Sequence, residues 1–327
     1  MEKISTLEDR ENQLILTACF QANHLRMGMI QEDGAVLIAQ DYPCDTTSPM
    51  LFVDSLCDAI QRFLEQFGGR RAFRSIGVST SGWVDPKEGV WRHTRKVDGF
   101  REPVPLAALL YRRMGLRAYI DNNVHLRTLA EIHYGVGRSY ANLLYYHVGY
   151  GIGVGVAVES QLLRGTANYS GECGRGFYEL YGEGEYAMLE DFASGRGMVD
   201  MARALLPKHP NSELVKTEKR GALTFHTILE GQRVGDELCE TILQRALRGI
   251  GFSVVNLVSV TNSEALVFGG GILSDGHMLQ WLIDFLNEYL SPPTLNTLSF
   301  IGTSRIPVQD VALIGASHMV RRAEGEC

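Results

Sequence analysis

The sequence has few of the features that mark secreted, membrane-spanning or metal-stapled proteins. Its six cysteines are scattered and none forms a C-x-x-C pair, which argues against a disulfide framework and a cysteine-based zinc site. No run of about 18 or more apolar residues is present, and the opening stretch MEKISTLEDRENQ is polar. We therefore expect a cytoplasmic chain with reduced thiols, no signal peptide and no membrane partner.

The chain also lacks an excess of positive charge. Its formal net charge is −7, so no global basic field attracts nucleic acid or an anionic membrane. The nearest approach to a basic patch is GRRAFR at residues 69–74, and it follows a predicted helix whose C-terminal dipole it would complement. We expect no direct nucleic-acid binding by this chain.

What is present is an alternation of strand and helix patterns in a chain long enough for two domains. The stretches LILTACF and HLRMGMIQEDGAVLIAQ predict two strands joined by a turn at Asp33–Gly34. A helical stripe follows, and then the strand SIGVSTSG, the helix VPLAALLYRRMG and the strand LRAYIDNN. The stripe consists of Val53, Leu56, Ile60, Phe63 and Phe67. This order predicts an α/β domain with a mixed sheet.

A second series with a similar order begins after Asn123. It comprises the helix VHLRTLAEIHYG, the strand pair NLLYYHVGYGIGVGVAVESQLLRG, a long apolar helix and the strand ALVFGGGIL. Because strand hairpin, helix, strand and Gly-rich turn occur twice, we predict two related halves that face each other across a cleft, where a small molecule can bind.

Two glycine-rich segments are candidates for contact with phosphate. GYGIGVG alternates glycine with other residues at Gly149, Gly151 and Gly153, which lets a ligand or another backbone approach. Phosphate contact and a tight sheet crossing explain this pattern equally well. The strand that ends in Gly269, Gly270 and Gly271 precedes a predicted helix, a geometry suited to a nucleotide but common in α/β proteins.

Several motifs in order resemble the ROK family (repressors, open reading frames, kinases) of the actin-like sugar-kinase superfamily, over essentially the whole chain. STSGWVDPKEGV resembles the family's sugar-side strand and turn, and IDNNVHLRTLAE resembles E-N-D-A-N-x-x-x-x-A-E. HVGYGIGVGV resembles the second phosphate hairpin, GECGR resembles G-E-x-G-H, and YGEGEYAMLEDFASGRG fits the family's zinc loop without a gap. The resemblance implies a two-domain actin-like α/β fold with an interdomain cleft. Its closing helix would pack back on the first domain, so we predict domains at 1–120 plus about 306–327 and at 121–305.

The same resemblance exposes departures at the catalytic positions. Asn123 stands where the family's kinases carry the catalytic aspartate, and a neutral amide cannot accept the sugar's proton, a role worth roughly 10²–10⁴-fold in rate. The first phosphate loop, D-x-G-G-T, falls on CFQAN, so Cys19, Gln21 and Ala22 replace the aspartate and both glycines. Mg²⁺ binding and close phosphate approach are therefore both expected to be lost.

The zinc loop has lost its ligands as well. The resemblance places its cysteines at Tyr181, Glu183 and Met188 and its histidine at Arg175, and none of these is a thiolate or imidazole donor. We predict a loop without metal, held by packing of Tyr181, Met188 and Phe192 and by an Arg175–Glu183 pair.

The sugar-facing groups of the family are retained in part. The resemblance implies a sugar-binding set at Gly82, Asn122, Asn123, Glu172, Arg175 and Glu190. Helix capping and ordinary surface charge are the alternative roles for these side chains. His125, in place of the family's second asparagine, is predicted to be a helix-start residue and not a catalytic base.

These features favour a ROK-family regulator that binds a sugar or sugar phosphate without phosphorylating it, with no cofactor and no metal. The glycine segments are then vestigial nucleotide contacts. We expect a homodimer or other homo-oligomer and, because only a short polar stretch precedes the first strand, a regulatory protein partner in place of a helix-turn-helix. The alternatives are a hexose or amino-sugar kinase that uses ATP and Mg²⁺ in a remodelled site, and a DNA-binding repressor, which the negative charge disfavours.

Overall fold

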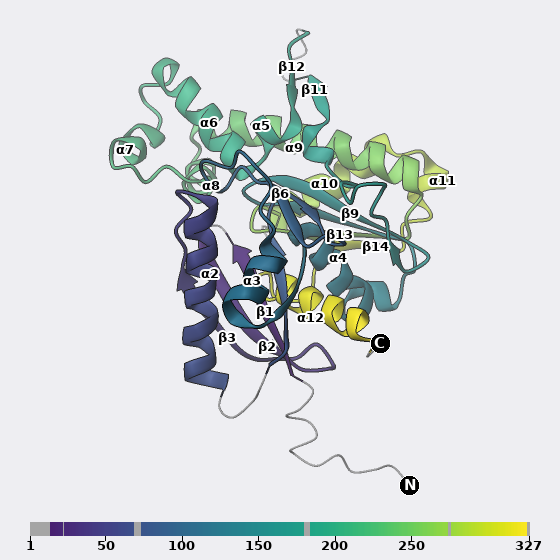
Figure 1. The fold of residues 1–327 in the computed structure, drawn as a ribbon. Helices are drawn as coiled ribbons and strands as arrows, with labels where there is room; N and C mark the ends of the chain where they lie inside the picture. The colour runs from purple at the N-terminus through teal and green to yellow at the C-terminus, as the bar shows by residue number, and fades with distance from the viewer. Residues whose placement is uncertain (1–13, 22, 69–72, 180–183, 274–275, 326–327) are drawn as a thin grey trace. The chain divides into compact units, whose positions relative to one another are not determined.

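The computed structural model describes residues 14–21, 23–68, 73–179, 184–273 and 276–325, which fall into two compact units (Figure 1). Unit 1 consists of Met1–Ser139, Gln161–Ser170 and Arg305–Cys327, and unit 2 of Tyr140–Ser160 and Gly171–Ser304. The chain thus returns to unit 1 for residues 161–170, which we call the crossover segment.

Unit 1 is built on a five-stranded mixed sheet in the order β3-β2-β1-β4-β7. Its first three strands pair antiparallel, and β4 joins β1 and β7 in parallel. The strands are β1 (Ile15–Gln21), β2 (His24–Ile30), β3 (Val36–Pro43), β4 (Ser75–Thr80) and β7 (Arg117–Asn122). The predicted turn at Asp33–Gly34 joins β2 to β3, with Gly34 at φ 85°. The prediction of two strands was wrong, because β1 and β2 are separate antiparallel strands in which Gln21 pairs with His24.

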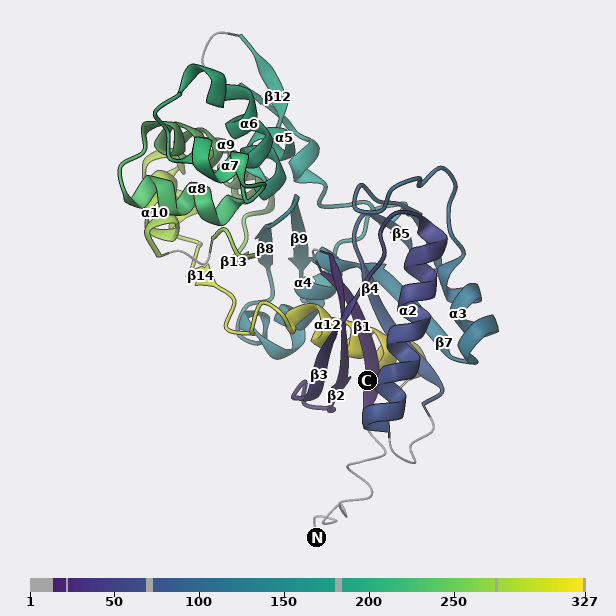
Figure 2. The same cartoon turned by 90° about the vertical axis from the view of Figure 1, so that its left-hand side faces the viewer.

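Helices cover both faces of this sheet (Figure 2). They are α2 (Pro49–Phe63), α3 (Leu106–Met114), α4 (Asn123–Tyr134) and α12 (Val311–Glu324), with short turns at η1 (Leu64–Gly68) and η2 (Val136–Arg138). Side chains of β1 alternate between the two faces. Phe20 packs edge-on to Phe52 of α2, with ring centroids 4.9 Å apart, whereas Cys19 is buried in a cluster with Leu313 of α12.

Helix α2 shows how local sequence fixes an element of this layer. Ser48 caps it by accepting a hydrogen bond from Leu51 N at 3.2 Å, and Pro49 occupies the first turn. The predicted stripe is buried from Val53 to Phe63, and Phe67 follows in the π-helical turn η1. A small antiparallel hairpin pairs β5 (Trp83–Asp85) with β6 (Val90–His93), and the crossover segment contains the short β10 (Gln161–Leu162).

The division of the chain differs from the predicted boundary at residue 120. Helix α4 belongs to unit 1 because it packs against α12, so closely that a Cβ on Gly315 would lie 1.7 Å from the carbonyl oxygen of Leu126. The crossover segment also belongs to this unit. Both differences arise from contacts between residues far apart in sequence, which strand and helix patterns do not encode.

Unit 2 repeats the topology of unit 1. Strands β9 (Ile152–Val158), β8 (Leu143–Val148), β13 (Ala265–Gly269) and β14 (Phe300–Thr303) are neighbours in that order. An antiparallel hairpin is again followed by parallel strands. A separate hairpin pairs β11 (Phe177–Glu179) with β12 (Tyr186–Met188). The repeated order confirms the mixed α/β fold class predicted from the sequence.

The core of unit 2 lies between its sheet and a group of helices. These are α5 (Leu189–Ala193), α6 (Gly195–Leu205), α7 (Leu214–Lys219), α8 (Phe225–Arg233), α9 (Glu237–Thr261), α10 (Gly276–Tyr289) and α11 (Pro292–Leu295), with 3-10 turns at η3 (Cys173–Arg175) and η4 (Leu206–Lys208). The predicted long apolar helix is α9, which Asp236 caps at its start and Asn262 ends in the left-handed conformation at φ 46°. Among the described residues, no helix is both long and apolar enough to cross a membrane.

Candidate functional site

Two predicted site residues, Gly82 and Asn122, meet at the carboxyl ends of β4 and β7. The Nδ2 group of Asn122 donates to the carbonyl oxygen of Gly82 at 2.7 Å. Its Oδ1 accepts from the backbone N–H of Val124 at 2.7 Å, so Asn122 also caps α4. Gly82 has φ 85°, and a Cβ there would lie 2.1 Å from the carbonyl oxygen of His93. The geometry thus requires glycine at this turn, and Asn122 fills the capping role that was the alternative to ligand binding.

Asn123 is the first residue of α4 and is partly exposed beside Asn122. Its carboxamide cannot take up a proton at ordinary pH, so it cannot act as a general base. The carboxylate beside it in sequence, Asp121, is fully buried. Asp121 Oδ1 accepts from Asn122 N at 2.7 Å and from Asn168 Nδ2 at 2.9 Å, and Arg164 lies 2.5 Å from Oδ2.

The electrostatics of Asp121 follow from these partners. Burial raises the pKa of this carboxyl, but His125, Arg164 and Asn168 more than offset burial and lower the pKa to about 2. His125, as predicted, lies in the first turn of α4, where it is buried with Nδ1 3.5 Å from Asp121 and Nε2 3.2 Å from the carbonyl oxygen of Ser170. Sequence reasoning missed this network, because Arg164 and Asn168 lie more than 40 positions from Asp121.

In unit 2, predicted residues gather around the β8–β9 turn. Glu190 accepts a hydrogen bond from Ile152 N at 3.2 Å, and a Cβ on Gly151 would lie 2.8 Å from the same carboxylate. The carbonyl oxygen of Gly149 accepts from Gly195 N at 2.8 Å. Close packing of Glu190 therefore explains glycine at position 151, while a Cβ on Gly149 would lie 2.8 Å from Nε2 of His147. Gly153 lies opposite His147 in the β8–β9 ladder.

Glu172 and Arg175 form a second contact within this unit. Their side chains, each more than a third exposed, lie 3.4 Å apart at Oε2 and Nε, so the pair contributes little to stability. The predicted partner of Arg175, Glu183, lies outside the described residues, as does Tyr181.

The described part of the loop that resembles a zinc site contains one strand pair and one buried aromatic ring. Met188 pairs with Phe177 in the β11–β12 ladder. Phe192 is buried in the core, and a Cβ on Gly249 of α9 would lie 2.6 Å from its ring. A thioether at Met188 and a guanidinium at Arg175 do not suit four-coordinate zinc, so these described positions do not fit the metal.

The positions that would hold phosphate and Mg²⁺ are only partly adapted to that task. Cys19 is fully buried, and Gln21 Nε2 donates to the carbonyl oxygen of Gln309 at 2.6 Å; Ala22 lies outside the described residues. In unit 2, Gly270 has φ 92°, and a Cβ there would lie 2.1 Å from the carbonyl oxygen of Val148, whereas a Cβ on Gly271 would meet nothing within 4 Å. Cys19 and Gln21 supply no charged Mg²⁺ ligand, while a side chain at Gly271 would meet open space.

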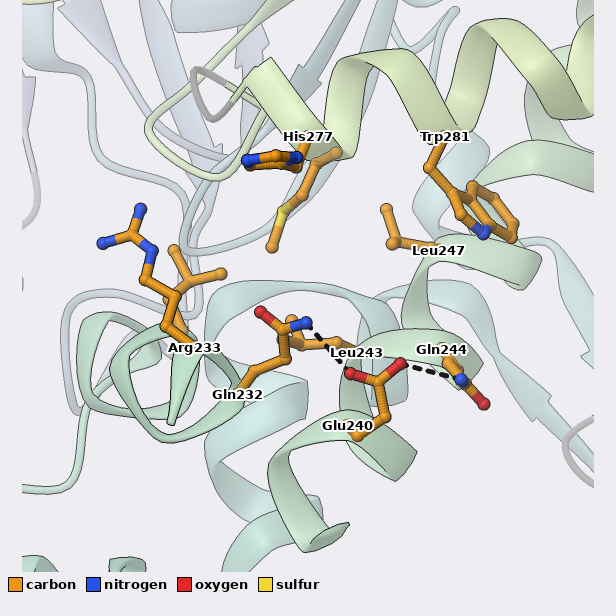
Figure 3. A pocket seen from close by; sticks show the side chains of 10 residues that line it. Gln232, Arg233, Glu240, Leu243, Gln244, Leu247, His277 and Trp281 are labelled. Atoms are coloured by element: carbon orange, nitrogen blue, oxygen red, sulfur yellow. Dashed lines mark hydrogen bonds between the residues drawn. The ribbon is translucent and has the colours of Figure 1, made fainter. Parts of the chain in front are cut away.

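A pocket of about 480 Å³ in unit 2 was not anticipated from the sequence. Helices α8, α9 and α10 line it with Leu229, Gln232, Arg233, Glu240, Leu243, Gln244, Leu247, His277, Met278 and Trp281. Figure 3 shows Arg233 and His277 away from Trp281, with Glu240 held by Gln232 at 3.0 Å and by Gln244 at 2.7 Å. The pocket joins an apolar wall to polar groups, as small-molecule sites do. No sequence motif marks this pocket, because three separate helices contribute its lining residues.

Comparison with known proteins shows what this architecture resembles. The chain is 26% identical to a glucokinase of Thermotoga maritima over 316 residues, covering 91% of this chain and 94% of that enzyme. It is 25% identical to a xylose repressor of Caldicellulosiruptor bescii over 218 residues, or 65% of this chain, and spans only about half (54%) of that repressor.

Solved structures share the fold. A ROK family transcriptional regulator, a homologue of the E. coli MLC protein, matches with a TM-score of 0.80 at 20% identity, covering 96% of this chain and 79% of that chain. A ROK family glucokinase from Streptomyces griseus, in complex with glucose and AMPPNP, matches with a TM-score of 0.77 at 21% identity, covering 94% and 99%. The ROK family model itself matches residues 22–323. The chain therefore belongs to the ROK family, whose members include both sugar kinases and repressors.

Proposed function

We propose that this chain is a sugar-sensing regulatory member of the ROK family, which binds a sugar or sugar phosphate and does not transfer phosphate to it. The main support comes from the residues at the junction of β7 and α4. Asn122 and Asn123 are neutral there, and the adjacent carboxylate of Asp121 is buried and bonded to Arg164, Asn168 and a backbone N–H. Within the described junction, no carboxylate is placed to accept a proton from a sugar hydroxyl.

The binding half of the proposal rests on retained polar groups. Asn122 has a second Nδ2 hydrogen beyond the one given to Gly82, and the Glu172 side chain is partly exposed beside Arg175. Groups of this kind bind vicinal hydroxyls, and mispairing a buried polar group costs roughly 1–3 kcal/mol, which is the source of specificity. The regulatory half draws on the repressors among the relatives, and a protein partner would carry the signal onward.

The test combines binding with turnover. Calorimetry against a panel of hexoses, amino sugars, pentoses and their phosphates should find at least one ligand, and a coupled ATPase assay with Mg²⁺ should find no sugar-dependent turnover. A matched ROK glucokinase serves as the positive control. Sugar-dependent turnover above about 1 s⁻¹, within the ordinary kinase range, would replace this proposal by the kinase alternative.

The kinase alternative is supported by one specific observation. The glucokinase relative aligns over nearly the whole chain, and the turn at Gly270–Gly271 keeps the conformation and the space that a phosphate needs. Under this alternative Mg²⁺ would be held without Asp at position 19. A gain of turnover with Mn²⁺ in place of Mg²⁺ would favour such a remodelled site.

A further inference from the structure

The buried carboxylate of Asp121 joins three segments of unit 1. Its Oδ1 binds the backbone N–H of Asn122 at the end of β7, and His125 of α4 lies beside it. From the crossover segment come Arg164, on Oδ2, and Asn168, on Oδ1.

The conformation of the crossover segment places Arg164 and Asn168 beside Asp121. Asn168 has φ 63°, a left-handed conformation that asparagine adopts more readily than most residues. Its Oδ1 accepts from Arg164 at 2.7 Å, and its Nδ2 also lies 3.1 Å from the carbonyl oxygen of Val84 in β5. Beside it, Tyr169 stacks on Trp83 with ring centroids 5.3 Å apart. The segment is therefore tied both to the end of β7 and to the hairpin that follows Gly82.

We propose that Asp121 is a positioning residue, which anchors the crossover segment to the carboxyl ends of the unit 1 strands and holds Asn122 and the turn at Gly82 in their ligand-competent places. The role in ligand binding rests on the proposed sugar-sensing function, whereas the anchoring itself does not. Asp121 makes no contact with ligand in this assignment; it acts through Asn122, whose N–H it binds and whose side chain reaches Gly82.

The chemistry of the anchor requires a carboxylate and not merely a polar side chain. One oxygen accepts from Asn122 and Asn168, and the other faces the guanidinium of Arg164. In Asp121→Asn, one orientation of the amide turns its NH₂ toward Arg164, and the flipped orientation turns it toward two other donors. Neither orientation satisfies every partner, and an unmatched buried donor is costly.

Hydrogen exchange on the full-length chain tests the anchor without any ligand. In Asp121→Asn we expect the amides of Asn122 and of residues 161–170 to exchange at least about tenfold faster, because local opening exposes them. Arg164→Gln is the milder variant, since its side chain is partly exposed, and it should give the same pattern. Core amides of α9 should stay unchanged in both. Arg203→Gln, which breaks an exposed pair with Glu218, is the matched control and should leave residues 161–170 as in the wild type.

Sugar affinity supplies the second readout, taken with the ligand found for the wild type. Arg164→Gln should weaken binding by about tenfold, which corresponds to 1.4 kcal/mol, while Arg203→Gln changes nothing. The Asp121→Asn and Arg164→Gln effects should not add in the double variant, because they remove one interaction. Unchanged exchange at Asn122 and at 161–170 in both variants would overturn the anchor. If a variant showed faster exchange at residues 161–170 but bound the sugar as tightly as the wild type, Asp121 would not position the ligand site. If the wild type binds no sugar, the proposed function fails. The exchange data then still test whether Asp121 anchors the crossover segment.

Discussion

His133 and His318 stack face to face where α4 meets α12, with ring centroids 3.6 Å apart and planes 18° from parallel. Burial, the neighbouring His133 and the charges of Arg322 and Arg321 lower the pKa of His318 to about 4, and burial with Arg322 also lowers the pKa of His133. Both rings are therefore neutral in the folded protein at neutral pH, and two protonated rings at this distance would repel each other.

We predict that this stack makes unit 1 less stable in acid. In the unfolded chain the ring of His318 has a pKa near 6.5, so its contribution is complete above that pH and is lost progressively as pH falls from about 6.5 to 4. Between pH 7.5 and pH 5, His318 should lower the free energy of unfolding in urea by about 1–3 kcal/mol. His318→Gln should flatten the pH dependence, whereas the control His226→Gln, on exposed α8 surface, should not. If the free energy of unfolding changed with pH equally in His318→Gln and in the wild type, His318 would not be the source of the acid sensitivity.

Gly315→Ala should destabilise the same contact. A methyl group at this position would lie 1.7 Å from the backbone oxygen of Leu126, and backbone of two packed helices cannot shift aside cheaply. We expect the free energy of unfolding to fall by about 3 kcal/mol, which is in the upper part of the range for overpacking. Gly276→Ala, where a Cβ meets nothing within 4 Å, should be nearly neutral. Comparable unfolding midpoints for the two variants would show that α12 does not pack on α4 as described.

These contacts show where sequence reasoning succeeded and where it failed. Strands β4 and β7 and helices α2 and α9 follow from local patterns and caps, because burial imposes a regular spacing of apolar residues. The partner of α4 is α12, some 180 positions away, and no local pattern connects Leu126 with Gly315. The domain boundary was therefore placed too early, at the strand–helix junction.

The candidate site divides in the same way. Motif resemblance found Gly82 and Asn122, which do contact each other, and found Glu190 beside Gly151. It did not find Arg164 and Asn168, because a buried carboxylate recruits donors by geometry and not by spacing. The pocket lined by Trp281 has no sequence signal, since separate helices contribute single residues to it.

Glu172→Ala tests the ligand role of a partly exposed carboxylate. Its ion pair with Arg175 lies on the surface, so the loss of that pair should change the free energy of unfolding by less than about 1 kcal/mol. Sugar affinity should fall about tenfold or more, because hydroxyl groups lose a charged acceptor. Glu288→Ala, on the exposed face of α10, is the matched control. Equal affinities for the two variants by calorimetry would remove Glu172 from the site.

Purified protein should contain no stoichiometric zinc. The described positions Met188 and Arg175 carry no thiolate or imidazole, and zinc binds tightly only to such donors or to carboxylates in a closed set. Elemental analysis after dialysis should give well below about 0.1 zinc per chain, and chelator should leave the melting temperature unchanged. About one zinc per chain, lost together with stability on chelation, would show that the loop recruits other ligands.

Restoring an acid at the base position should not by itself restore phosphoryl transfer. Asn123→Asp places a carboxylate at the start of α4, where the helix dipole favours it, and a general base alone is worth roughly 10²–10⁴-fold. Transfer also needs Mg²⁺ and close backbone contact with the phosphates, yet Cys19 is buried and Gln21 is bonded to Gln309. We therefore expect Asn123→Asp to keep sugar affinity within about threefold and to show no turnover above background. A variant that also carries Cys19→Asp, Gln21→Gly and Ala22→Gly should be the first to gain measurable turnover. Robust turnover by Asn123→Asp alone would mean that the β1 turn already accepts Mg²⁺ and phosphate, and that one side chain separates this chain from the kinases of its family.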